Sequence, residues 1–145
     1  MVLTVVDLRT GRLLAEGPKA EYGETLNARV ASVLASDGGT VVTQLGGGAV
    51  AWNTETGAEL WRQAADEQSI TPLALPTADV LYASADDLGL TALDMGTKKV
   101  LASRLVPDIT SELTADGDVL QLTTGGYGVL ASGYDLFVFA PETKQ

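Results

Sequence analysis

Two acidic clusters are the residues of this chain whose type and spacing could hold a metal ion. One cluster is Asp86-Asp87, and the other is Asp116-Gly117-Asp118. Calcium takes about six to eight oxygen ligands, and neither cluster has the ligand spacing of an EF-hand loop. Both lie where hairpin turns are expected, and Asp favours turns because its carboxylate accepts backbone N–H bonds. We therefore interpret both clusters as turns and expect no metal site.

Two glycine-rich stretches, 46–48 and 125–128, have the composition of loops that bind phosphate groups. Such a loop needs a following Lys and Ser or Thr, and a helix whose N-terminus faces the anion. Neither stretch is followed by this pattern. Glycine is also the residue of tight hairpins, so we predict hairpin turns at both places.

Acid–base and nucleophilic chemistry is restricted by composition, because the chain has no cysteine and no histidine. Disulfides, thiolate metal sites and nucleophiles activated by histidine are therefore excluded within this sequence. We expect no catalytic residue, no cofactor and no enzymatic activity.

The charge balance indicates which partners the chain can have. It carries 9 basic and 19 acidic residues, for a net charge of −10. Such a surface repels phosphate backbones and anionic membranes. No apolar stretch approaches the roughly 20 residues of a membrane helix, and no secretory signal is visible at the N-terminus. The expected partner is therefore a protein, with no nucleic acid and no direct membrane insertion.

A repeated phrase indicates the elements that would position these residues. Its copies are residues 5–11, 51–57, 92–98 and, less closely, 139–144. The threonines that anchor the copies are separated by 46, 41 and 46 residues: Thr10, Thr56, Thr97 and Thr143. Self-similarity at a period of roughly 40 residues is typical of propellers.

Short β-rich runs follow turn clusters in phase with this phrase, beginning at Val41, Val80 and Val119 in steps of 39 residues. Such runs indicate strands joined by tight turns. No sustained helical period is present, so the predicted fold class is all-β. The predicted strands cover about residues 2–7, 12–16, 30–35, 40–45, 49–53, 58–63, 70–75, 79–84, 89–94, 98–103, 109–114, 118–123 and 135–140.

The repeated phrase has the chemistry of a turn between two strands. Its Asp or Asn accepts backbone N–H bonds, its Thr does so more weakly, and its Gly supplies a positive φ. The full set is Asp7, Thr10 and Gly11 in the first copy, and Asn53, Thr56 and Gly57 in the second. In the third copy Asp94 and Thr97 are kept but Lys98 replaces Gly, which predicts a rearranged turn.

Residues 51–61, Ala51-Trp52-Asn53-Thr54-Glu55-Thr56-Gly57-Ala58-Glu59-Leu60-Trp61, resemble the repeat of the quinoprotein-like (PQQ-type) propeller family. The resemblance implies four-stranded antiparallel blades, with Trp61 docked against the neighbouring blade. The corresponding positions in the other readable copies are Ala15 and Ala102, which implies looser junctions there. Trp52 is expected to fill the core.

The resemblance covers the whole chain, which we interpret as one partial β-propeller domain, residues 1–145, with about three blades in an incomplete ring. The predicted units are a partial blade at 1–17, blades at 28–63 and 69–104, and a partial blade at 108–145. Two arrangements would complete the ring. One is a segment of a longer propeller, which we favour, and the other is a homodimer.

The expected function is a non-enzymatic scaffold for protein interaction and assembly, in a bacterial envelope or the lumen of the secretory pathway. Similar propellers occur in the outer-membrane assembly lipoproteins and in the lumenal part of the endoplasmic-reticulum membrane protein insertase. The alternatives are a fragment of a quinoprotein-type oxidoreductase, which would bind a quinone and calcium, and a sensor of a small ligand or glycan.

The last repeat is longer than the others. Val119 and Thr143 are 24 residues apart, whereas the matching distances are 17 and 15 residues in the earlier repeats. We therefore predict an insertion of about seven residues within 125–134, although an ordinary loop or an extra hairpin also fits. Tyr127 and Tyr134 in this segment are the candidate partner-binding residues, because loops carry function and tyrosine is enriched at interfaces.

Overall fold

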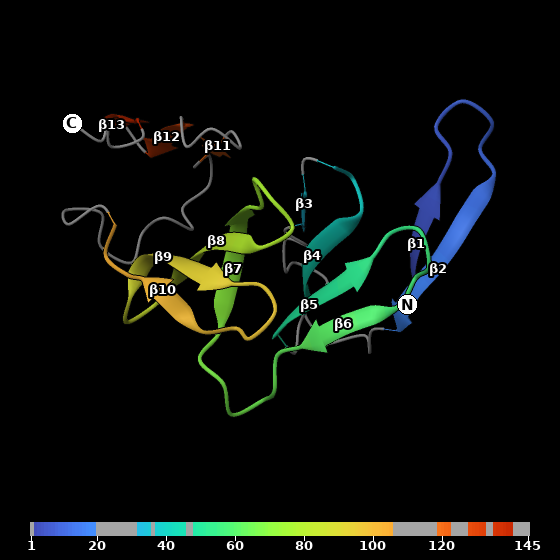
Figure 1. Cartoon of the computed structure of the whole chain (residues 1–145), viewed down its shortest axis with the longest axis horizontal. Coiled ribbons are helices and arrows are strands. Elements are labelled where there is room, and N and C mark those ends of the chain that lie inside the picture. The colour runs from blue at the N-terminus through green and yellow to red at the C-terminus, as the bar shows by residue number, and fades with distance from the viewer. Residues whose placement is uncertain are drawn as a thin grey trace.

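The computed structural model describes residues 2–19, 32–35, 37–45, 48–105, 119–122, 128–132 and 135–140. These residues form thirteen strands in four antiparallel sheets, and they contain no helix (Figure 1). Within each sheet the strands pair in chain order, so each sheet is a meander of hairpins.

The bounds of the strands follow the predicted turns. The first sheet consists of β1 (Val2–Val6) and β2 (Leu13–Lys19). The second consists of β3 (Ser32–Leu34), β4 (Thr40–Leu45), β5 (Gly48–Asn53) and β6 (Glu59–Arg62). The third consists of β7 (Ile70–Ala74), β8 (Val80–Ala85), β9 (Gly89–Asp94) and β10 (Val100–Ala102). The fourth consists of β11 (Val119–Leu122), β12 (Gly128–Ser132) and β13 (Asp135–Phe139).

The second sheet is covered on both faces, and β5 shows this residue by residue. Ala49 and Ala51 belong to the core that this sheet shares with the third sheet. Val50 and Trp52 belong to the core on the other side, where β1 of the first sheet supplies Leu3. A strand that is covered on both faces is apolar throughout rather than alternating, which accounts for the continuous apolar sequence of β5.

The order of the strands places one edge of each sheet inside and the other outside. The strand β7 contacts both β3 and β11, so the first described strands of three successive sheets lie close together. The last strands, β2, β6 and β10, are the outer strands of their sheets. Four-stranded meanders arranged in this way are the blades of a β-propeller. The predicted all-β propeller with an incomplete ring is therefore confirmed.

The fourth sheet contains one strand that the sequence did not predict. This strand is β12, which lies within the predicted insertion at 125–134 and pairs with β11 on one side and β13 on the other. The strand β11 contacts β7, as both β3 and β4 of the second sheet do.

The segment 125–134 therefore contains a strand, as the alternative of an extra hairpin expects, and is not a single loop. The neighbouring strands β11 and β13 agree with the predicted strands at 118–123 and 135–140. The predicted strand at 109–114 lies outside the described residues.

Candidate functional site at the junction of the second and third sheets

The first repeated turn joins β1 to β2 and is built around the carboxylate of Asp7. This carboxylate accepts hydrogen bonds from the backbone N–H of Arg9 at 2.8 Å and of Thr10 at 3.0 Å. The hydrogen bond from Thr10, which has the larger effect, and that from Arg9 hold the pKa of Asp7 below its usual value. Gly11 has a φ of 69°, which L side chains rarely adopt.

The second repeated turn joins β5 to β6 and has the same bonds around an amide. The Asn53 Oδ1 accepts from the N–H of Thr56 at 2.9 Å and from its hydroxyl at 3.0 Å. Gly57 has a φ of 73°. This turn packs directly on the first sheet, because a Cβ added at Gly57 would lie 1.9 Å from the backbone oxygen of Glu16.

The third repeated turn joins β9 to β10, and here the predicted rearrangement was wrong. The Asp94 carboxylate accepts from the Thr97 hydroxyl at 2.7 Å and from the Thr97 N–H at 2.8 Å. Both bonds lower the pKa of Asp94, and the bond from the Thr97 hydroxyl has the larger effect. Lys98 adopts the left-handed conformation itself, with a φ of 59°, and its N–H donates to the Asp94 carbonyl at 2.8 Å.

A left-handed conformation costs a residue with a Cβ about 1–2 kcal/mol. The turn nevertheless keeps its form because its hydrogen bonds match those of the other two turns. Lys98 also gains side-chain contacts that glycine would lack, and these contacts belong to the junction described next.

Trp61 of β6 crosses from the second sheet to the third. Its indole Nε1 donates to the backbone oxygen of Met95, just after β9, at 2.7 Å. The half-buried ring packs against the core that the second and third sheets share. The side chain therefore fixes the outer strand of one blade to the next blade.

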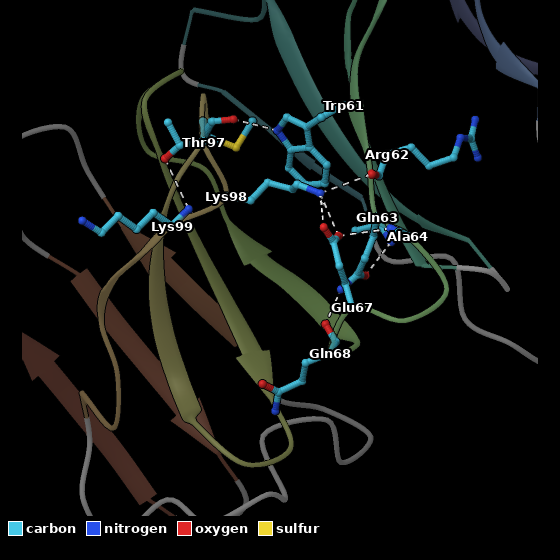
Figure 2. A network of polar contacts seen from close by, with 11 residues as sticks. Trp61, Arg62, Gln63, Ala64, Glu67, Gln68, Thr97, Lys98 and Lys99 are labelled. Carbon is cyan, nitrogen blue, oxygen red and sulfur yellow. Dashed lines mark hydrogen bonds and ion pairs between the residues drawn. The ribbon is translucent and has the colours of Figure 1, made fainter.

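The side chain of Lys98 covers the ring of Trp61 and continues to the loop after β6. Its Nζ lies 5.9 Å from the centroid of the ring and 2.7 Å from the Oε2 of Glu67 (Figure 2). It also approaches the Arg62 carbonyl at 3.5 Å. The hydrogen bond from Lys98, followed by that from the Ala64 N–H, holds the pKa of Glu67 below its usual value. This set of contacts is called the Trp61–Lys98 junction below.

A cleft of about 220 Å³ lies beside the Trp61–Lys98 junction, between β6 and the strands of the third sheet. Pockets for drug-sized ligands measure about 300–1,000 Å³, so this cleft is small. Gln63 in its lining is buried, its Oε1 accepts from the Ala49 N–H at 3.0 Å, and its Nε2 donates to the Gln68 carbonyl. Its amide is thus already engaged in joining strand and loop.

The remaining predicted residues divide into described and undescribed ones. Asp86 and Asp87 lie exposed in the turn between β8 and β9. Tyr127 and Tyr134 lie outside the described residues, but the segment between them is the strand β12 and not one loop. Within the described part of the chain, no group of three or more His, Cys, Asp and Glu side chains is placed to hold a metal ion.

Two features of the site escaped the sequence. Glu67 was not singled out, because it lies 31 residues from its partner Lys98 and belongs to no repeated position. The sequence has Lys98 in place of glycine, which predicted a rearranged turn. In the structure the turn is unchanged, and the Lys98 side chain lies over Trp61 and binds Glu67.

The outer strands share a second feature, a bulge that carries an exposed leucine. In each, a residue is skipped in the pairing with the neighbouring strand: between Leu13 and Ala15, between Glu59 and Trp61, and between Val100 and Ala102. The strand β2 has a second irregularity between Glu16 and Lys19. The skipped residues are Leu14, Leu60 and Leu101, which are 49%, 53% and 55% exposed. These three side chains are called the bulge leucines below.

The stacked meanders, the shared turn and the docked tryptophan define a β-propeller built from PQQ-type repeats. The family model described as outer membrane protein assembly factor BamB matches residues 1–131, and the chain belongs to this family. No curated protein matches the chain.

Among solved structures, the chain is similar to the computationally designed Ika4 protein. The identity is 18% and the TM-score 0.56, over 97% of this chain and 80% of that one. The computationally designed Ika8 protein is 17% identical with a TM-score of 0.49, over 92% of this chain and 41% of that one. The likeness to Ika4 agrees with the fold. Among the described residues there is no helix of the length and apolarity needed to cross a membrane.

Proposed function

We propose that this chain is a non-enzymatic scaffold for protein interaction, a segment of a larger propeller protein that takes part in membrane protein assembly. The observation that carries the proposal is the set of bulge leucines, one on the outer strand of each of three consecutive sheets. Exposed apolar side chains repeated on a rigid frame are suited to binding a protein partner. The description of the family, an outer membrane protein assembly factor, supports the same role.

The outer edges suggest the form of the partner. An outer strand presents backbone N–H and C=O groups that can pair with an added strand. A bulge leucine beside such an edge favours a segment with apolar side chains. Strands of outer-membrane barrels alternate apolar and polar residues over roughly 10 residues. We infer that the partner contributes extended segments of this kind, bound at several edges at once.

A peptide-binding measurement tests the proposal. The probe is a fluorescent peptide with alternating apolar and polar residues of the outer-membrane strand type, followed by anisotropy. The triple variant L14S/L60S/L101S should bind it at least about tenfold more weakly than the original chain. The matched control is Leu8→Ser, since Leu8 is fully exposed but lies in a turn.

Two results would contradict the scaffold role at these edges. One is equal affinity of the triple variant and the original chain for the peptide. The other is equal binding of a shuffled peptide with the same composition, which would show that alternation is not recognised. Tyr127 and Tyr134 stay predicted partner contacts, and a Y127A/Y134A variant in the same measurement tests them.

A further inference from the structure

The residues that line the cleft beside the Trp61–Lys98 junction come from the second sheet, the third sheet and the loop between them. Its floor is the face of the third sheet that packs on the second. Leu93 belongs to the core that these sheets share, and Val100 pairs with it across β9 and β10. Thr91 lies on the same face, two residues before Leu93, and Ala85 of β8 lines the floor as well. The cleft is therefore formed by two neighbouring blades inside the chain.

The buried polar side chains of this cleft already have partners. Thr91 is fully buried, and its hydroxyl donates to the Gly89 carbonyl at 3.1 Å. The oxygen and the nitrogen of the Gln63 amide are both hydrogen-bonded. A polar ligand would have to break these bonds, and a buried polar group without a partner costs free energy. The cleft is therefore suited to an apolar group.

The volume of the cleft, about 220 Å³, restricts the size of that group. An engineered cavity of about 150 Å³ with an apolar lining binds benzene. Pockets for drug-sized ligands begin at about 300 Å³. The volume of this cleft lies between these values, so it fits a group of the size of one aromatic ring.

Two side chains favour an aromatic group over an aliphatic one. The ring of Trp61 lines the cleft, and aromatic rings attract one another in offset-stacked or edge-to-face arrangements. Lys98 also lines it, with its Nζ 5.9 Å from the centroid of the Trp61 ring (Figure 2). A second ring in the cleft would lie close to the same cation, and ammonium groups are attracted to the faces of aromatic rings.

The cleft reaches the surface beside the outer strands. The side chains of Lys98 and Glu67, which both line it, are 32% and 41% exposed. Trp61 of β6 and Val100 of β10 line it too, and each is the direct neighbour of a bulge leucine. A segment that binds at these edges therefore passes close to the cleft.

We propose that this cleft binds one aromatic side chain of the extended segment that the partner contributes. The assignment rests on the proposed function, which supplies that segment. Strands of outer-membrane barrels have aromatic residues at both ends of their apolar band, so such segments contain a suitable ring. The cleft then selects segments with an aromatic residue, whereas the bulge leucines accept any apolar one.

A series of peptides tests this selection by fluorescence anisotropy. The reference peptide has the alternating pattern of the outer-membrane strand type with leucine at every apolar position. In the other peptides phenylalanine replaces one leucine at a time. At least one phenylalanine peptide should bind the original chain about tenfold more tightly than the reference.

Val100→Trp fills the mouth of the cleft from a residue that is 43% exposed, so it does not require space in the core. It should abolish the preference for phenylalanine and leave the affinity for the reference peptide within about twofold. The matched control is Leu13→Trp. Leu13 precedes the bulge leucine of β2 as Val100 precedes that of β10, but it does not line the cleft. This control should keep the preference.

Circular dichroism of both variants checks the fold. If Val100→Trp does not fold, Ala85→Val narrows the same cleft from its floor and should reduce the preference. A variant that folds and keeps the full preference for phenylalanine would overturn the proposal, because the ring would then bind elsewhere.

The remaining outcomes separate this proposal from the scaffold role. Equal affinity for all peptides, with weaker binding by L14S/L60S/L101S, would overturn the aromatic site and leave the scaffold role in place. If no peptide binds, the scaffold role fails, and calorimetric titration with free p-cresol shows what the cleft takes. Binding of p-cresol would then replace the partner's side chain with a small aromatic ligand. No binding would overturn the aromatic site altogether.

Discussion

Gly57 and Lys98 occupy the same place in successive turns, yet the surfaces in front of them differ. Gly57 faces the backbone oxygen of Glu16 so closely that no Cβ fits, whereas Lys98 extends its side chain over Trp61. The difference follows from the outer strand of the preceding blade, which has Ala15 in one case and Trp61 in the other. A small residue lets the next turn approach the backbone, and a large one holds that turn away.

The glycine turns provide a matched pair of substitutions. Gly11 and Gly57 have nearly the same φ, 69° and 73°, but a Cβ at Gly11 meets nothing within 4 Å. We expect Gly11→Ala to lower the free energy of unfolding by about 1 kcal/mol, through the left-handed conformation alone. Gly57→Ala should lower the free energy of unfolding by about 3 kcal/mol or more, because the backbone at Glu16 must move away from the added Cβ. Urea unfolding measures both, and equal losses would contradict the close approach to Glu16.

Lys98 allows the conformational cost to be separated from the contacts. Lys98→Ala keeps the left-handed Cβ but loses the contacts with Trp61 and Glu67, and should destabilise the chain by about 1 kcal/mol. Lys98→Gly loses the same contacts but also removes the Cβ, which makes the left-handed conformation unfavourable. It should therefore be about 1 kcal/mol more stable than Lys98→Ala. If the alanine variant were the more stable of the two, the positive φ at this position would be refuted.

Trp61 should contribute more than the contacts around it. Truncation of buried aromatic residues costs about 3–5 kcal/mol, and since Trp61 is half-buried we expect about 2–3 kcal/mol for Trp61→Ala. Trp61→Phe keeps most of the ring but not the hydrogen bond to Met95, and should cost about 1 kcal/mol. Thermal unfolding of the two variants and the original chain measures this order. An unchanged melting temperature for Trp61→Ala would refute the docking role.

The ion pair at the junction predicts a dependence of stability on pH. The pKa of Glu67 is lower in the folded chain than its ordinary value of 4.5. The contribution is therefore complete above the unfolded pKa and is lost as the pH falls through the lower folded pKa. Glu67→Gln should lower the melting temperature slightly at neutral pH. Between neutral and acidic pH, the melting temperature of this variant should change less than that of the original chain. Identical pH profiles for the two chains would contradict the pairing with Lys98.

Most of the fold could be predicted from the sequence, because the repeated turn residues mark where each strand ends. The phrase at Asn53, Thr56 and Gly57 places β5 and β6 on either side, and the predicted strand at 40–45 coincides with β4 (Thr40–Leu45). The strand β12 was not predicted, because its residues have no counterpart in the earlier repeats and were interpreted as an insertion. Its pairing with β11 and β13 becomes visible only in the structure.

Only part of the candidate site could be predicted from the sequence. The repeat indicated Trp61 as the docking residue, since aromatic residues at that position belong to the family pattern. It could not indicate Glu67, whose loop meets Lys98 only after two sheets have packed. The low solvent exposure of the Gln63 amide likewise depends on neighbours from β5 and the following loop.

The pairing of Trp61 with Lys98 bears on how such a protein can be lengthened or recombined. The two residues belong to different repeats, so a duplication that copies one blade from β3 to β6 would carry the tryptophan without its lysine. The copied tryptophan would then face a glycine turn, which has no side chain to cover its ring. The unit that can be inherited intact runs from the docking residue in β6 to the turn before β10, and it is offset from the third sheet by one strand.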